Sequence, residues 1–264
     1  MAFAEHATAT DECGEVINAA GAAPLVLVCE HATNHIPAEF GNLGLDAAAL
    51  ESHIAWDPGA LAVARRMSKR LDAPLVVPGV SRLLHDVNRP AASESACPAT
   101  SEIYEIPGNR NLTEAERQKR AERFYFPFHR RLESIIEGKL QRHPTVALVT
   151  IHSFVPVFHG AERTMDLGII HDADGRIADR LLEMGEAISM RVARNAPYGP
   201  GDGVTHTLAK HAVSRGLPNV MLEIRNDLIA TEAGQERLAA ILSQRVREAL
   251  SELIPAWELK ERSP

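Results

Sequence analysis

The sequence predicts one α/β domain built around a mainly parallel sheet. Short runs of consecutive apolar residues alternate along the chain with longer segments of helical character, and we find no internal repeat, low-complexity tract or linker. Strands that alternate with helices in this way are typical of parallel sheets, in which a helix joins each strand to the next. We expect residues 21–264 to form the domain and residues 1–20 to form a flexible N-terminal arm.

The apolar runs are continuous rather than alternating, which indicates strands that are buried on both faces of the sheet. They cover residues 25–29, 75–77, 146–151, 165–170 and 220–224. Helices are predicted at residues 46–72, 113–142, 174–193, 204–215 and 231–253. Thr113 and Glu116 have the spacing of a capping box at the start of the second of these helices.

The overall composition excludes two classes of partner. The 264 residues are 45% hydrophobic and 24% charged, as is usual for a soluble globular protein. The formal net charge of -7 argues against a nucleic-acid partner. No apolar run approaches the length of about 20 residues that spans a bilayer, so we expect no membrane association.

The cysteines and the N-terminal residues favour a cytoplasmic protein. The first residues lack the basic and apolar regions of a secretory signal. Cys13, Cys29 and Cys97 are too few for a disulfide framework, and their number is odd. A reducing compartment is the natural interpretation. Because Cys29 lies within the first apolar run, we interpret it as a small core residue rather than a reactive thiol.

Polar residues of catalytic type follow the predicted strands. Ligands bind beyond the carboxyl ends of the strands in open α/β sheets, so these residues are the first candidates for a site. His31 follows the first run, His152 follows the run at 146–151, and Glu223 lies in the last run. Asp57 lies in the segment between the first strand and the next.

These residue types suit metal-assisted hydrolysis. A catalytic zinc site needs three N or O ligands and one open position for water, and His31, Asp57 and His152 would supply two imidazoles and a carboxylate. Glu223 is the best candidate for the base that activates the water, since a carboxylate in an apolar strand is costly without a partner. Arg225 is suited to hold a substrate carboxylate, because a guanidinium binds a carboxylate through two hydrogen bonds.

Each of these residues also has a structural interpretation. A single His at a strand end is more often structural than catalytic. Asp57 precedes Pro58 and could cap a helix, and Glu223 could pair with an internal arginine. The sequence contains no G-x-S-x-G nucleophile elbow and no Walker or dinucleotide glycine motif.

Six segments resemble the N-formylglutamate amidohydrolase family, in the family's order, over about residues 24–230. They cover residues 28–37 (VCEHATNHIP), 53–60 (HIAWDPGA), 81–89 (SRLLHDVNR), 151–154 (IHSF), 195–198 (NAPY) and 222–227 (LEIRND). The resemblance implies a three-layer α/β/α sandwich with a mixed sheet, similar to zinc-dependent exopeptidases and cell-wall amidases. It also implies a zinc ion, or another divalent metal, held by His31, Asp57 and His152, with Glu223 as the catalytic glutamate.

The family's reaction is the hydrolysis of N-formyl-L-glutamate to formate and glutamate, at the end of one route of histidine degradation. This substrate carries two carboxylates, and the resemblance suggests that Arg89 and Arg225 each hold one. The residues that would assist them are Asn34, Asn88, Ser81 and His129. For Arg82 and Arg89, a structural salt bridge is as good an interpretation as a substrate contact. For His129, a position on the helix surface is as good an interpretation as a position in the pocket.

Two other functions remain open at this stage. One is a deacylase of another N-acyl amino acid or small peptide-like amide, because pocket shape decides the acyl group and the side chain. The other is a non-catalytic binding protein of the same fold, which predicts loss of a ligand or base, whereas all four residues are present. The sequence does not define the roles of His35 and His53, the metal or the oligomeric state.

Overall fold

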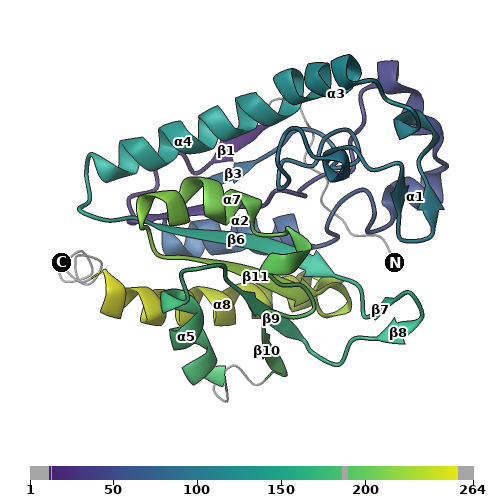
Figure 1. Ribbon diagram of the computed structural model, residues 1–264. Helices are drawn as coiled ribbons and strands as arrows, with labels where there is room; N and C mark the ends of the chain where they lie inside the picture. The colour runs from purple at the N-terminus through teal and green to yellow at the C-terminus, as the bar shows by residue number, and fades with distance from the viewer. Residues whose placement is uncertain (1–11, 13, 186–189, 255–264) are drawn as a thin grey trace.

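The computed structural model describes residues 12, 14–185 and 190–254 and contains a seven-stranded sheet (Figure 1). Its order is β1-β3-β2-β6-β11-β9-β10. The strands are β1 (Glu15–Ile17), β2 (Leu25–Val28), β3 (Leu75–Val77), β6 (Ala147–Phe154), β9 (Leu167–Ile170), β10 (Val192–Arg194) and β11 (Asn219–Arg225). Four neighbouring pairs are parallel, and the pairs β1–β3 and β9–β11 are antiparallel. The predicted fold class, an α/β domain with a mixed, mainly parallel sheet, is confirmed.

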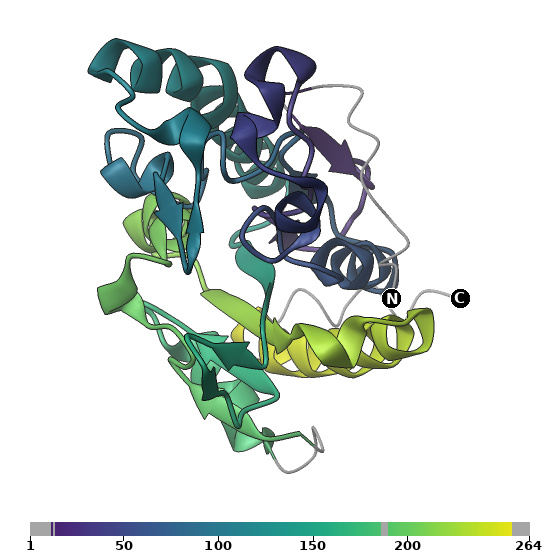
Figure 2. The same ribbon diagram turned by 90° about the vertical axis from the view of Figure 1, so that its right-hand side faces the viewer.

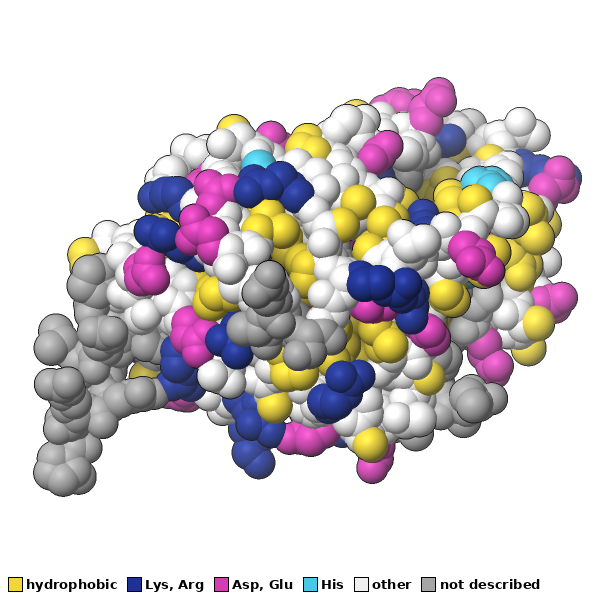
Figure 3. Space-filling view, turned by 90° about the horizontal axis from the view of Figure 1, so that it is seen from below, with side chains coloured by type: hydrophobic (Ala, Val, Ile, Leu, Met, Phe, Trp, Pro, Cys, Tyr) yellow, Lys and Arg dark blue, Asp and Glu magenta, His cyan; other side chains and the backbone are white. Residues whose placement is uncertain are grey.

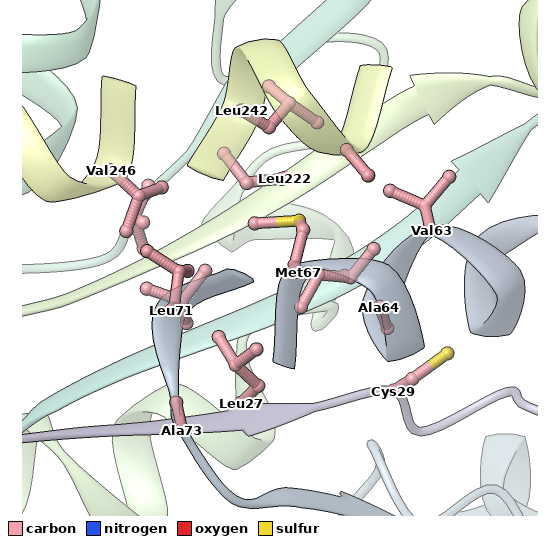
Figure 4. Close-up of a cluster of buried hydrophobic side chains, with 14 of the residues drawn as sticks. Leu27, Cys29, Val63, Ala64, Met67, Leu71, Ala73, Leu222, Leu242 and Val246 are labelled. Carbon is pink, nitrogen blue, oxygen red and sulfur yellow. The ribbon is translucent and has the colours of Figure 1, made fainter. Parts of the chain in front are cut away.

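Helices cover both faces of the sheet and make a three-layer structure (Figure 1). One face carries α2 (Ala60–Leu71), α5 (Arg176–Glu183) and α8 (Glu232–Leu253), and the other carries α4 (Phe126–Leu140) and α7 (His206–His211). Figure 4 shows Met67 of α2 between Leu242 of α8 and Leu27 of β2. Burying one such side chain contributes about 1.5–3 kcal/mol, so this interface fixes the sheet against both helices.

The predicted helix at 46–72 is two helices. A short α1 (Ala47–Glu51) and α2 are separated by residues 52–59. Pro58 cannot continue a helix, and Gly59 has a φ of 82°, a left-handed conformation that favours glycine. The interruption creates the loop that carries Asp57.

Two other helix predictions also need correction. The segment 113–142 begins with the predicted capping box of Thr113 and Glu116, but a π-helical turn at Ala121–Tyr125 separates α3 (Glu114–Arg120) from α4. Of the predicted helix 174–193, α5 covers Arg176–Glu183 and β10 begins at Val192, while residues 186–189 lie outside the described part of the chain.

The N-terminal segment contributes an edge strand. Glu15–Ile17 pairs with β3, so this part of the predicted arm belongs to the sheet. A continuous apolar run does not mark it, because only one side of an edge strand has a neighbour and its residues are partly exposed. Residues 1–11 and 13 lie outside the described part of the chain.

Two small hairpins, absent from the sequence prediction, stand beyond the carboxyl ends of the central strands (Figure 2). They are β4–β5 (Thr100–Ser101 and Tyr104–Glu105) and β7–β8 (Val157–Phe158 and Ala161–Glu162). The backbone N–H of His159 donates to Oε1 of Glu102 at 3.1 Å and so joins them. Strands of two residues give no periodic signal in a sequence.

The surface seen from below in Figure 1 mixes charges of both signs. Lys and Arg side chains lie among Asp and Glu side chains on this face, with hydrophobic atoms between them (Figure 3). Within the described residues, no helix is both long enough and apolar enough to cross a membrane.

Candidate active site

His31, Asp57 and His152 meet at the carboxyl ends of β2 and β6. These strands are parallel neighbours, so the residues at their ends lie side by side. One ligand atom from each residue lies within 4.8 Å of the others, and all three side chains are buried. Oδ2 of Asp57 is 3.3 Å from Nδ1 of His31 and 2.8 Å from Nδ1 of His152. The predicted metal ligands therefore converge on one point.

The loop before α2 places Asp57 between the two histidines. Its backbone N–H donates to the carbonyl oxygen of His31 at 2.9 Å, and the backbone N–H of Ser153 donates to Oδ2 of Asp57 at 3.3 Å. The N-cap of α2 is Gly59, with no side-chain capping bond. Asp57 thus does not cap the helix, and that alternative is excluded.

Two further carboxylates lie behind the imidazoles. Nε2–H of His31 donates to Oδ1 of Asp86 at 2.8 Å, and Nε2 of His152 lies 3.0 Å from Oε2 of Glu30. With Nε2 of each ring in contact with a carboxylate, Nδ1 of each ring faces Asp57. Metal-binding histidines commonly have a carboxylate at the ring nitrogen that does not bind the metal. Our sequence interpretation missed Glu30 and Asp86. Both lie inside the six segments that resemble the family, but a sequence motif does not show which histidine an acidic residue contacts.

The electrostatics of the cluster hold the pKa values of Asp57 and Asp86 below their ordinary range. Burial alone would raise the pKa of Asp57, but His31 and His152 lower that pKa far below its ordinary value. Burial also opposes ionisation of Asp86, yet its pKa lies well below the usual range because of His31. For His152, burial lowers the pKa, and Glu30 and Asp57 outweigh this effect and raise it well above 6.5. The site therefore attracts positive charge.

Glu223 projects from β11 beside this cluster. It is the register partner of His152 in the parallel pair of β11 and β6. Its side chain is buried, and Oε2 has no hydrogen-bond partner in the part of the chain that the structure describes. Burial raises the pKa of Glu223 to about 7, although His152 opposes the shift. No described arginine forms an ion pair with it, which argues against the structural alternative.

The donor set fits a divalent metal ion. Four carboxylates of the site are buried, those of Glu30, Asp57, Asp86 and Glu223. The guanidinium of Arg82 lies among them, 2.9 Å from Asp86 and 3.6 Å from Asp57. Buried carboxylates are costly unless cations compensate them. Two imidazoles and one carboxylate that line a pocket form a ligand set that suits zinc.

A pocket of about 300 Å³ opens over the cluster. Besides the three candidate ligands and Glu223, its lining includes Arg82, Asn88, Arg89, His53, Glu102, Phe158, Tyr198, Asp202 and Val204. His53 pairs with Glu102 at 2.9 Å. Arg89 donates to the carbonyl oxygens of Asn88 and Gly203, and no described carboxylate lies within ion-pair distance of it.

A model of the N-formylglutamate amidohydrolase family matches residues 23–230. The chain belongs to this family. The resemblance drawn from six segments is confirmed, and membership makes the chain an amidohydrolase.

Solved structures extend the comparison over most of the chain. A gene product of Agrobacterium tumefaciens is 51% identical, with a TM-score of 0.90, over 94% of this chain and 98% of that chain. The N-formylglutamate amidohydrolase from Ralstonia eutropha JMP134 is 24% identical, with a TM-score of 0.62, over 93% of this chain and 99% of that chain, which shows a shared fold. No curated protein matches the chain.

In this family member, two of the six predicted substrate-binding residues line the pocket, Asn88 and Arg89. The amide of Asn88 is already engaged: it donates to the carbonyl oxygen of Val204 and accepts from the N–H of Thr207. Asn88 therefore ties the segment around Val204 to the pocket wall. Both hydrogen bonds of Arg89 come from Nη1, so its guanidinium has further N–H donors without a described partner.

The other four predicted contacts lie outside the pocket lining, namely Arg225, Asn34, Ser81 and His129. Arg225 pairs with Asp166 at 2.9 Å and Asp227 at 2.8 Å, so local carboxylates neutralise it. Asn34 donates to the carbonyl oxygen of Leu50, and Ser81 donates to that of Ala55. Each of these side chains therefore has at least one internal partner.

His129, His35 and Cys29 also have defined surroundings. His129 is buried, and its Nε2 lies 2.9 Å from the carbonyl oxygen of Val87, so it is neither on the helix surface nor in the pocket. His35 is exposed and is not part of the metal-binding group. Cys29 is fully buried in the core beside α2, where burial raises the pKa of its thiol.

Proposed function

We propose that the chain is a zinc-dependent amidohydrolase that cleaves the formyl amide of N-formyl-L-glutamate to give formate and L-glutamate. One observation carries this proposal: a buried His-Asp-His cluster lies beside the buried Glu223, whose Oε2 has no hydrogen-bond partner among the described residues, and both face one pocket. Family membership supports hydrolysis of an amide, and the guanidinium of Arg89, which pairs with no described carboxylate, supports an anionic substrate.

His31, Asp57 and His152 would hold the metal ion through their Nδ1 and Oδ2 atoms. Bound zinc would supply a Lewis acid for the formyl oxygen and would lower the pKa of a coordinated water to about 7. Asp86 and Glu30 would keep the two imidazoles in the tautomer that leaves Nδ1 free for the metal.

Glu223 would act as general base and then as general acid. It takes the proton of the attacking water and passes it to the nitrogen of the leaving amino acid, so that formate and a free amine result. A pKa of about 7 suits both steps near neutral pH, because the group then gains and loses a proton easily. Its free Oε2 leaves room for this proton.

The amino-acid part of the substrate must supply most of the binding energy, since a formyl group is small. Arg89 would bind one carboxylate of N-formylglutamate by a charge-assisted hydrogen bond. Arg225, which is paired with two aspartates, is left out of the proposal.

The proposal is tested by assaying the zinc-loaded protein on N-formyl-L-glutamate, N-formyl-L-glutamine, N-formyl-L-methionine and N-acetyl-L-glutamate. We expect the highest kcat/KM for N-formyl-L-glutamate, loss of activity with a chelator and recovery with zinc. Preference for another member of the panel would make the chain a deacylase of that substrate. Activity that survives complete chelation would overturn the metal mechanism.

Glu223→Gln provides the second arm of the test. Removing the base should lower kcat by about 100-fold or more, while zinc remains bound. Glu232→Gln, at an exposed position of α8, is the matched control and should keep full activity. Full activity of Glu223→Gln would remove Glu223 from the mechanism.

A further inference from the structure

Tyr198 is a pocket residue to which the mechanism above gives no role. It ends the family segment at 195–198, and its ring lines the pocket. The guanidinium of Arg163 lies over three aromatic rings, at 4.4 Å from the centre of Phe158, 4.7 Å from that of Tyr198 and 5.6 Å from that of Phe154. Arg163 thus stacks against the wall that Phe158 and Tyr198 form.

The hydrogen bond between these two residues fixes the direction of the phenol. Nη1 of Arg163 lies 3.0 Å from the hydroxyl oxygen of Tyr198. A guanidinium only donates, so the phenol oxygen must accept this bond, and its own hydrogen remains available. No other described residue forms a hydrogen bond with that hydroxyl. The phenol therefore has a free donor in the pocket wall.

Close packing of the backbone brings the segment that carries Tyr198 to the side of Glu223. β9 carries Gly168, the register partner of Glu223 in the antiparallel pair of β9 and β11. A Cβ at Gly168 would lie 2.1 Å from the carbonyl oxygen of Ala196 and 3.2 Å from Cβ of Glu223. The chain just before Tyr198 is thus pressed against the strand that adjoins Glu223. Burial raises the pKa of Tyr198, and Glu223 raises it further, as expected for close neighbours.

We propose that Tyr198, held by Arg163, is a substrate-binding residue that donates a hydrogen bond to the α-carboxylate of the N-acyl amino acid. This inference rests on the proposed function. The α-carboxylate is attached to the carbon that bears the amide nitrogen, so it lies close to the atoms on which Glu223 acts. Arg89 then binds the side-chain carboxylate. Tyr198 and Arg89 together provide a hydrogen-bond donor for each of the two substrate carboxylates, and Arg225 is not needed.

This assignment also explains the place of Arg163. No described carboxylate lies within ion-pair distance of its guanidinium, which leaves its positive charge uncompensated beside the pocket. The charge polarises the phenol and favours an anion at the free donor. Arg163 is accordingly a positioning residue that acts through Tyr198.

The test compares two substrates that differ only at the α-carboxylate. Tyr198→Phe removes the hydroxyl alone, and a hydrogen bond to a charged group is worth about tenfold or more in binding. We expect KM for N-formyl-L-glutamate to rise about tenfold with little change in kcat, and KM for the α-amide of that substrate to change less than about twofold. N-formyl-L-glutamine, which keeps the α-carboxylate, should show the full effect. Tyr104→Phe, in the β4–β5 hairpin outside the pocket lining, is the control.

Three results would overturn the proposal. One is an equal loss on the α-amide, another is a fall in kcat at unchanged KM, and the third is no effect on any substrate. Calorimetric binding of L-glutamate and its α-amide to the zinc-loaded protein repeats the comparison without turnover. If the wild type hydrolyses nothing in the panel, the proposed function fails, while this binding comparison still decides the role of Tyr198.

A double-mutant cycle tests Arg163. If it acts through the phenol, Arg163→Gln should raise KM, and Tyr198→Phe with Arg163→Gln should cost no more than the larger single effect. Arg163→Lys should restore KM only in part, because an ammonium lacks the planar group that stacks on the rings. Additive losses would mean that Arg163 does not work through Tyr198.

Discussion

Asp86 accepts a hydrogen bond from Nε2 of His31 at 2.8 Å, in the interior of the site. The same carboxylate accepts from Arg82 at 2.9 Å and from the backbone N–H of Asn88 at 2.9 Å. A carboxylate with three donors stays ionised and stays in place. It therefore fixes both the ring and the tautomer of His31, and it ties the proposed ligand to the segment that carries Asn88 and Arg89.

Asp86→Asn should weaken zinc binding by about 10- to 100-fold, because the amide no longer polarises the imidazole of His31. A competition titration with a chromophoric chelator measures this. Asp202→Asn also changes a pocket carboxylate, but among the described residues this one contacts neither histidine, so the variant should bind zinc as the wild type does. Equal affinity for Asp86→Asn and wild type would assign Asp86 a purely structural role.

Metal removal should lower the stability of the fold. The buried carboxylates of the site lose the cation that compensates them, and a ligand at 100 times its Kd contributes about 2.7 kcal/mol. We expect the melting temperature to fall with a chelator and to recover with zinc. His152→Ala should show no zinc-dependent shift, whereas His35→Ala, at an exposed position, should shift as the wild type does. A wild-type melting temperature indifferent to zinc would count against the site.

The sequence predicted the residues of the candidate metal site better than their surroundings. His31, Asp57 and His152 could be found because parallel strands present their ends at one edge, a property of the whole topology. For Arg225, the sequence indicated a group suited to a carboxylate but did not reveal that Asp166 and Asp227 pair with it. Such pairings join side chains from separate elements, and no local pattern encodes them.

Helix and hairpin boundaries differ in how far local sequence signals define them. The break at Asp57 could have been read from Pro58 and Gly59, because proline and glycine interrupt helices by known local mechanisms. The hairpins at 100–105 and 157–162 could not, since their strands pair over two residues each. Their position against one another depends on the bond between Glu102 and the backbone of His159, which only the folded chain defines.

Gly168→Ala should impair both stability and substrate binding. The new methyl group would overlap the carbonyl oxygen of Ala196, and forced packing of this kind costs about 1–3 kcal/mol. Displacing Ala196 also moves Tyr198, so KM for N-formyl-L-glutamate should rise. Gly138→Ala is the matched control, because nothing lies within 4 Å of its Cβ in α4, and it should stabilise the chain by about 0.5–1 kcal/mol. Urea unfolding and steady-state kinetics measure both effects, and a Gly168→Ala protein as stable and active as wild type would refute the packing argument.

The buried pair of His129 and His211 should make the fold sensitive to acid. Nε2–H of His129 donates to the carbonyl oxygen of Val87, so Nδ1 of His129 accepts from Nε2–H of His211 at 2.7 Å, and both rings are neutral. Burial and the neighbouring His211 lower the pKa of His129 to about 2, and burial with Arg215 lowers the pKa of His211 to about 3.

These shifts define a pH window and its sign. The unfolded chain binds protons at a pKa of about 6.5, while the folded pair does not, so stability is full above that pH and falls as pH decreases toward the folded pKa values. Each histidine should contribute a loss of about 1.4 kcal/mol per pH unit below 6.5. Urea unfolding at pH 7.5, 6.0 and 5.0 measures the slope. His129→Gln cannot titrate, so its stability should be lower at pH 7.5 but should fall less steeply with acid than that of the wild type. If stability falls with acid at the same slope in the two proteins, the pair binds as many protons in the folded chain as in the unfolded chain, and the argument fails.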